Sequence, residues 1–155
     1  MIKDSGERRV FPTGAVRDMQ EGKGRCDLLP LLVVARMLDA KTGDYIFRAL
    51  ATFLEKQDTK FLYAAMASFA PMAFGGKVES MILEVAIHFE AGAKKYGENN
   101  WQRGLPVRCY IDSALRHYLK WRRGDKDEPH HRAFIWNLMC CCWEVDYHEN
   151  KTVKN

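Results

Sequence analysis

The segment from about Lys77 to Tyr96 carries the strongest structural signal in this sequence. Apolar residues recur there at three- and four-residue spacing, which places them on one face of an α-helix. That stripe comprises Val78, Ile82, Val85, Phe89, Gly92 and Tyr96. A second stripe beside it carries Glu84, His88 and Lys95. Burying such groups is costly unless they are paired, hydrogen-bonded or bound to a metal, so we expect these side chains to have partners.

The remaining chain also has helical rather than strand periodicity. Further helices are predicted at about 31–38, 45–54, 61–69, 107–123 and 130–147. No alternating strand pattern persists, so we predict an all-α fold, a bundle of about five to six helices. An irregular N-terminal arm, rich in glycine, precedes the bundle, and Pro71–Gly76 is expected to break the helical pattern. A chain of 155 residues is long enough for one domain, which we place at 1–155.

Composition limits the compartment and the partners. The net charge of +4 permits an anionic partner, but it is modest for a protein that binds duplex nucleic acid. Three of the five cysteines are adjacent at positions 140–142, inside an apolar helical run, and no Cys-x-x-Cys pairs are present. This pattern predicts neither a disulfide framework nor a zinc site. Since no apolar segment is long enough to span a membrane, we expect a cytosolic protein with no membrane partner.

Several charged groups allow two interpretations. Lys23 and Arg25 alternate with glycines, which suits either a phosphate-binding loop or a solvated surface turn. Trp101 lies in a loop, where its indole could plug the core or stack on a base. Asp127 and Glu128 precede a helix; capping explains one of them, and a metal would explain both.

Other polar residues fall on the predicted helices. Asp112 and Arg116 have the spacing of a surface ion pair. His130, Asn137 and Glu144 recur every seven residues, which suggests either a structural network or the wall of a site.

Carboxylates and imidazoles on facing helices of a bundle can form a metal site in its core. Oxygen-rich sites suit Mg²⁺ or Mn²⁺, which commonly bind substrate phosphates as well. Phosphoryl chemistry needs mainly positioning and charge stabilisation, so it requires no nucleophilic side chain. This agrees with the absence of a nucleophile elbow, a Walker loop and a dinucleotide-binding turn.

Four linked stretches carry a family resemblance: TGAVRDMQEGKGRCDLLP, HFEAGAKKYGENNW, YIDSALRHYLKW and GDKDEPHHRAFIWN. In this order they resemble the dATP/dGTP diphosphohydrolase family of phages and bacteria, which is grouped with the all-α, MazG-like nucleotide pyrophosphatases. The resemblance covers Ser5–Pro30 and about Lys77–Glu144. Residues 31–76 look like an inserted helical segment.

The resemblance implies hydrolysis of a purine deoxynucleoside triphosphate to the monophosphate and pyrophosphate, with a divalent metal, Mg²⁺ or Mn²⁺. It implies Glu84, Asp112 and Asp127 as catalytic metal ligands, and His88 and His130 as further ligands or as groups that orient a carboxylate or water. The substrate-binding candidates are Lys23, Arg25, Lys95 and Arg116 for phosphates, Asn100 and Trp101 for the base or sugar, and Tyr96, His117 and Asn137.

This sequence departs from the MazG-like pattern in one respect. That pattern has two glutamates three residues apart, whereas Glu79 and Glu84 are five apart, and the later helices offer aspartate and histidine. A site containing histidine favours Mn²⁺ or another transition metal over Mg²⁺.

Other functions remain open. One is a non-catalytic helical module that binds a nucleotide or nucleic acid. Another is a phosphohydrolase that cuts a different bond. We expect a nucleotide partner rather than nucleic acid, and a homo-oligomer with its contact in helices 31–70.

Overall fold

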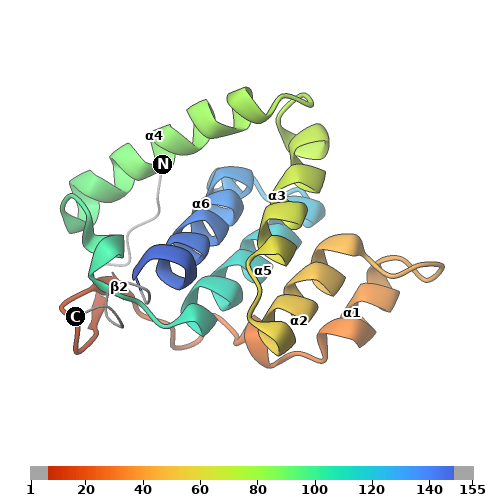
Figure 1. Ribbon diagram of the computed structural model, residues 1–155, viewed down its shortest axis with the longest axis horizontal. Coiled ribbons are helices and arrows are strands. Elements are labelled where there is room, and N and C mark those ends of the chain that lie inside the picture. The colour runs from red at the N-terminus through yellow and green to blue at the C-terminus, as the bar shows by residue number, and fades with distance from the viewer. Residues whose placement is uncertain (1–6, 149–155) are drawn as a thin grey trace.

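The computed structural model describes residues 7–148, and helices dominate them (Figure 1). The six α-helices are α1 (Leu31–Leu38), α2 (Tyr45–Lys56), α3 (Lys60–Ala73), α4 (Val78–Tyr96), α5 (Val107–Arg123) and α6 (His130–Trp143). Short helical turns occupy Cys26–Leu28, Asn100–Arg103 and Glu144–His148. The all-α prediction is confirmed.

Helix α6 lies at the centre and packs against α5, α4 and α3 (Figure 1). Its stripe of Phe134, Leu138 and Cys141 is fully buried, as its spacing predicts. Rings from three helices meet around Phe69, which contacts Tyr118, Trp121 and Phe134. Since aromatic side chains bury large apolar areas, this cluster is a major part of the core.

Helices α1–α3 share this core. Asp44, before α2, accepts a hydrogen bond from the Phe47 backbone N–H, which caps that helix. Its other oxygen accepts hydrogen bonds from the hydroxyl of Tyr118 and the guanidinium of Arg122, both on α5. The segment 31–76 is therefore joined to α5 by polar contacts as well as by packing.

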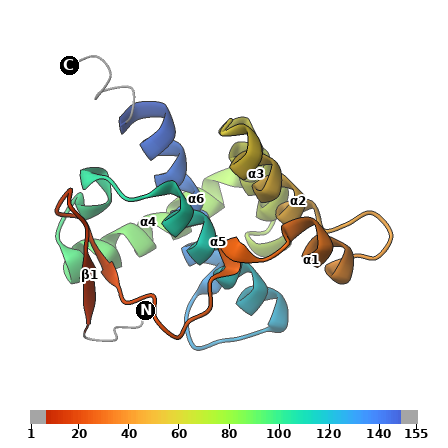
Figure 2. The ribbon, with the colours of Figure 1, turned by 90° about the horizontal axis from the view of Figure 1, so that it is seen from below.

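The N-terminal arm, residues 7–30 of the structure, contains a hairpin that the sequence did not predict. Strands β1 (Arg8–Val10) and β2 (Val16–Asp18) pair antiparallel. Strands of three residues are too short to display an alternating pattern. From this hairpin the arm crosses α5 and reaches α1 (Figure 2).

The predicted buried face of α4 was wrong in its first turns only, because Val85 is buried and Phe89 packs against the core as predicted. Val78 and Ile82 are 46% and 50% exposed, whereas Met81, Val85 and His88 are buried. Helix α4 packs mainly against α6, so only a narrow line of side chains is covered.

Two further observations concern the helices. Helix α3 continues through Pro71 to Ala73, beyond the predicted break. The proline removes the intrahelical hydrogen-bond donor of the Ala67 carbonyl, and Ala67 is exposed.

Among residues 7–148, no helix combines the length and apolarity needed to cross a bilayer.

Candidate functional site

A cavity of about 360 Å³, which we call the central pocket, lies between the arm and helices α4, α5 and α6. Its lining is both aromatic and charged: Arg9, Val16, Arg17, Asp18, Met19, Gln20, Lys23, His88, Gly92, Tyr96, Asn100, Leu105, Ser113, Arg116, His117, Lys120, Asp127, Glu128, Ala133, Trp136 and Asn137. The pocket exists only because the arm folds back onto three helices that are distant from it in sequence.

Cations from the arm and from α5 line the central pocket. Arg17 and Lys23 come from the arm, and Arg116 and Lys120 come from α5. Partial desolvation of its ammonium group lowers the pKa of Lys23, and repulsion from Arg116 and Arg17 lowers it further, although Asp18 acts in the opposite direction. A lysine with a lowered pKa beside two arginines marks a strongly positive region, which favours an anionic ligand.

An aspartate and two histidines form a hydrogen-bonded chain. Asp127 and His117 line the central pocket, whereas His130 lines a neighbouring cavity together with Asp127. Asp127 Oδ1 lies 2.7 Å from His130 Nε2, and His130 Nδ1 lies 2.8 Å from His117 Nδ1. Only one proton fits between the two Nδ1 atoms, so one of them presents a lone pair to the other. Burial and the neighbouring His130 hold the pKa of His117 well below its usual value, so His117 is neutral. Neutral imidazoles are the form that binds metals.

The same region could hold a divalent cation. One ligand atom from each of His117, Glu128 and His130 lies within 4.8 Å of the other two, and the same holds for Asp125, Asp127 and His130. Carboxylate oxygens mixed with imidazole nitrogens suit Mn²⁺ or a similar transition metal better than Mg²⁺. The donor set therefore fits a divalent ion. Asp127 does not cap α6, because its carboxylate is directed to His130.

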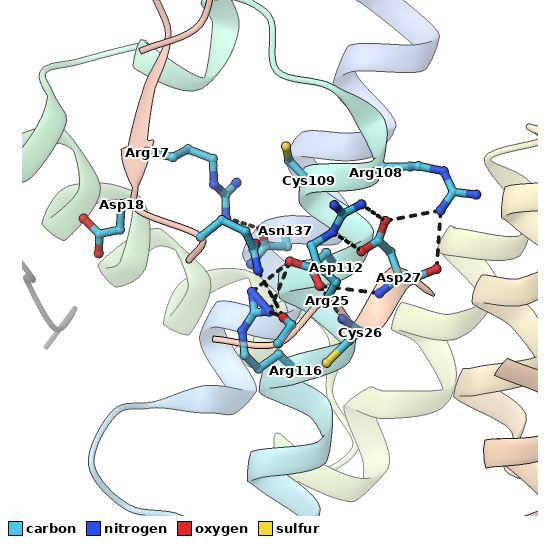
Figure 3. Close-up of polar contacts among 12 residues, drawn as sticks. Arg17, Asp18, Arg25, Cys26, Asp27, Arg108, Cys109, Asp112, Arg116 and Asn137 are labelled. Carbon is cyan, nitrogen blue, oxygen red and sulfur yellow. Dashed lines mark hydrogen bonds and ion pairs between the residues drawn. The ribbon is translucent and has the colours of Figure 1, made fainter. Parts of the chain in front are cut away.

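Asp112 lies outside the lining of the central pocket and is 2% exposed. Its Oδ1 accepts hydrogen bonds from the backbone N–H groups of Cys26 and Asp27, at 2.6 Å and 3.4 Å. Its Oδ2 is 2.9 Å from Nη2 of Arg116 (Figure 3). Asp112 thus connects the arm to α5 and orients Arg116, a cation of the pocket.

Arg25 lies beside this junction rather than in the pocket. It makes two 2.7 Å contacts with the buried Asp27, which Arg108 also contacts (Figure 3). The hydrogen bond from Arg25 is the main reason that the pKa of Asp27 is lowered.

Glu84 is separate from the other predicted ligands. Its Oε1 is 3.3 Å from both His131 Nε2 and Arg132 Nε on α6, and it does not line the central pocket. Of the three predicted catalytic carboxylates, the structure brings only Asp127 to the pocket.

His88 does line the pocket, packed against the Trp136 ring at 5.7 Å. Its burial lowers its pKa to about 4, so its ring is neutral near pH 7.

The other predicted substrate-binding residues fall into two groups. Tyr96 and Asn137 line the central pocket. Asn100 also borders it, but its amide is paired with both backbone groups of Val16 at 2.8 Å. Trp101 lies in a neighbouring aromatic hollow, edge-on to Phe89 and Trp143.

Lys95 and Tyr96 both contact Asp18 at 2.9 Å, which joins α4 to β2. Lys95 does not line the central pocket.

Sequence reasoning missed Arg17, Asp18, Lys120 and Trp136, all of which line the central pocket. Arg17 and Asp18 fall in the stretch TGAVRD that carried the family resemblance, which was the available signal. Trp136 has the spacing of an ordinary core aromatic.

A sequence model of the family described as "dATP/dGTP diphosphohydrolase, N-terminal" matches residues 55–154. This match covers well over half of the chain. The chain belongs to this family. Searches of curated proteins and of solved structures each returned no match.

The family match includes α3 to α6, and therefore the helical walls of the central pocket. It begins after the arm, so the role of the arm is inferred from the structure. The family name indicates a hydrolase that acts on purine deoxynucleoside triphosphates.

Proposed function

We propose that this protein hydrolyses a purine deoxynucleoside triphosphate to the monophosphate and pyrophosphate in the central pocket, with a divalent metal. One observation carries the proposal most directly. Five cations line the same cavity as the acidic and imidazole groups of Asp127, Glu128 and His117: Arg9, Arg17, Lys23, Arg116 and Lys120. A triphosphate needs cations, and a metal needs carboxylates or imidazoles, at adjacent places.

The chain's own residues would act mainly by positioning. Three of the cations would bind phosphate oxygens and stabilise the charge that develops on the leaving pyrophosphate: Lys23, Arg116 and Lys120. The rings of Tyr96 and Trp136 offer apolar surface for the purine. In the reaction a water oxygen bonds to the α-phosphorus, and the bond from this phosphorus to the bridging oxygen breaks.

The metal would be held by His117, Glu128 and His130. Asp127 would remain hydrogen-bonded to His130. A divalent ion at this place would neutralise phosphate charge and lower the pKa of the attacking water. The histidines favour Mn²⁺, and Mg²⁺ is the second candidate.

The direct test is incubation of the full chain with each deoxynucleoside triphosphate and either Mn²⁺ or Mg²⁺, with products separated by ion-exchange chromatography. We expect purine monophosphate and pyrophosphate in equal amounts, and loss of turnover with chelator. Glu128→Gln should reduce turnover at least tenfold, whereas Glu55→Gln, on the surface of α2, should not. Diphosphate and inorganic phosphate as products would indicate cleavage of a different bond, and binding without product would indicate a non-catalytic module.

A further inference from the structure

Arg17 is a partly buried cation without a carboxylate partner among residues 7–148. Its Nη2 lies 3.3 Å from Asn137 Oδ1, while its buried Nη1 has no hydrogen-bond partner in the described part of the chain. The adjacent Asp18 is directed to Arg8, Lys95 and Tyr96 instead. Leaving a buried charged donor unpaired costs free energy, so its retention in a pocket requires an explanation.

The surroundings of Arg17 fix its direction. Its guanidinium lies 5.5 Å from the ring centre of Tyr110 and 5.9 Å from that of Trp136. Asn137, on a buried position of α6, holds the other nitrogen; Figure 3 shows Arg17 reaching from β2 to this amide. Because two rings and an amide hold the side chain, the orientation of Nη1 is set before any ligand arrives.

The neighbouring charges select the class of ligand. Lys23 and Arg116 line the same cavity, and both are cations. Arg116 has Asp112 as its carboxylate partner, whereas Arg17 has no such partner in the described segment 7–148. An incoming phosphate oxygen would supply the missing negative charge, and a guanidinium suits phosphate geometry well.

We propose that Arg17 is a phosphate-binding residue of the central pocket, whose guanidinium pairs with a bound phosphate while Nη2 remains on Asn137. That this phosphate belongs to a deoxynucleoside triphosphate rests on the function proposed above. The anion site itself does not depend on hydrolysis.

The test is calorimetric titration of the full chain with inorganic triphosphate, without metal, at low and moderate salt. This probe has no base, so it reports on phosphate contacts alone. Arg17→Gln should raise Kd about 10- to 100-fold, because it removes a charge-assisted hydrogen bond. Arg17→Lys should have a smaller effect in the same direction. Arg48→Gln, which removes an equal charge from an exposed position of α2, should leave Kd within about twofold.

Asn137→Asp provides a second variant in case Arg17→Gln fails to fold. It has almost the same shape and gives Arg17 an internal carboxylate, so it should also weaken triphosphate binding at least tenfold. Circular dichroism verifies the fold of each variant.

Wild-type affinity in folded Arg17→Gln, or in folded Asn137→Asp, would overturn the proposal. A loss seen with a purine nucleotide but not with inorganic triphosphate would also overturn it, because Arg17 would then contact the base. If the wild type binds triphosphate through Arg17 but releases no pyrophosphate from any nucleotide, the phosphate site stands and the proposed hydrolysis fails.

Discussion

Asp112 is the residue at which the arm and α5 meet. One of its oxygens holds the backbone of Cys26 and Asp27, and the other holds Arg116. Its side chain is 3% exposed and that of Arg116 is 13% exposed, so solvent weakens this pair little. Single residues of this kind connect the stability of the fold to the charge of the central pocket.

We expect Asp112→Asn to lower the free energy of unfolding by about 3 kcal/mol, because it leaves a buried arginine unpaired. Urea denaturation followed by circular dichroism measures this change. Glu55→Gln, on the exposed surface of α2, is the control and should change stability by less than about 0.5 kcal/mol. A similar small effect for Asp112→Asn would mean that the arm anchor contributes little.

His88 should make stability depend on pH. Burial lowers its pKa to about 4 in the folded state, whereas the unfolded value is near 6.5. The unfolded chain therefore binds a proton first as pH falls, and stability decreases from about pH 6.5 towards pH 4. His117, whose pKa is also lowered by burial, acts in the same direction.

In urea titrations from pH 7 to pH 4.5, His88→Gln should flatten this decrease by about 2 kcal/mol. His148→Gln, near the end of the described chain, is the comparison variant. An unchanged pH slope in His88→Gln would contradict a neutral, buried His88.

Helix α4 and strand β2 both line the central pocket, and contacts between them hold the strand in place. Strand β2 is three residues long and could not be stable alone. It is held by Asn100, which follows α4 and pairs with both backbone groups of Val16. Asp18 adds contacts to Lys95 and Tyr96 of α4. The position of Arg17, between Val16 and Asp18, is therefore determined by both anchors.

Asn100→Ala should free the backbone of Val16 and lower the protection of this strand against hydrogen exchange by about 2 kcal/mol. Hydrogen–deuterium exchange with mass spectrometry resolves this local effect. Asn99→Gly is a matched control, because Asn99 has a φ of 60° that glycine adopts without strain. Equal exchange in both variants would show that Asn100 does not anchor the arm.

Binding of an anion to the positively charged central pocket should stabilise the folded state of the whole molecule. Inorganic triphosphate at about 100 times its Kd should stabilise the folded state by about 2.7 kcal/mol, provided that it binds only that state. Thermal unfolding at several concentrations measures this, and added salt should reduce the increase in Tm. A Tm independent of triphosphate would contradict an anion site.

A homo-oligomer in contact through helices 31–70 stays a prediction. On α1, Leu32, Val33 and Met37 are 61%, 57% and 77% exposed, and a second copy could cover them. Light scattering measures the mass in solution. We expect more than one chain for the wild type and a smaller mass for Met37→Glu. Leu83→Glu, at an exposed position of α4 outside the predicted contact, is the control. A monomeric wild type would refute the prediction.

Residue periodicity was enough to predict the helices, because it is a local property that each segment displays alone. The sequence also identified Lys23, Arg116, His117, Asp127 and Asn137, which now line one cavity. Which face of α4 is buried depends on tertiary packing: the helix packs mainly against α6, Met81 is buried, and Ile82 remains half exposed. The tertiary structure also places Glu84 and Asp112 outside the central pocket and Arg17 in its lining. Residue spacing did not predict these positions, because they depend on contacts between segments that are distant in sequence.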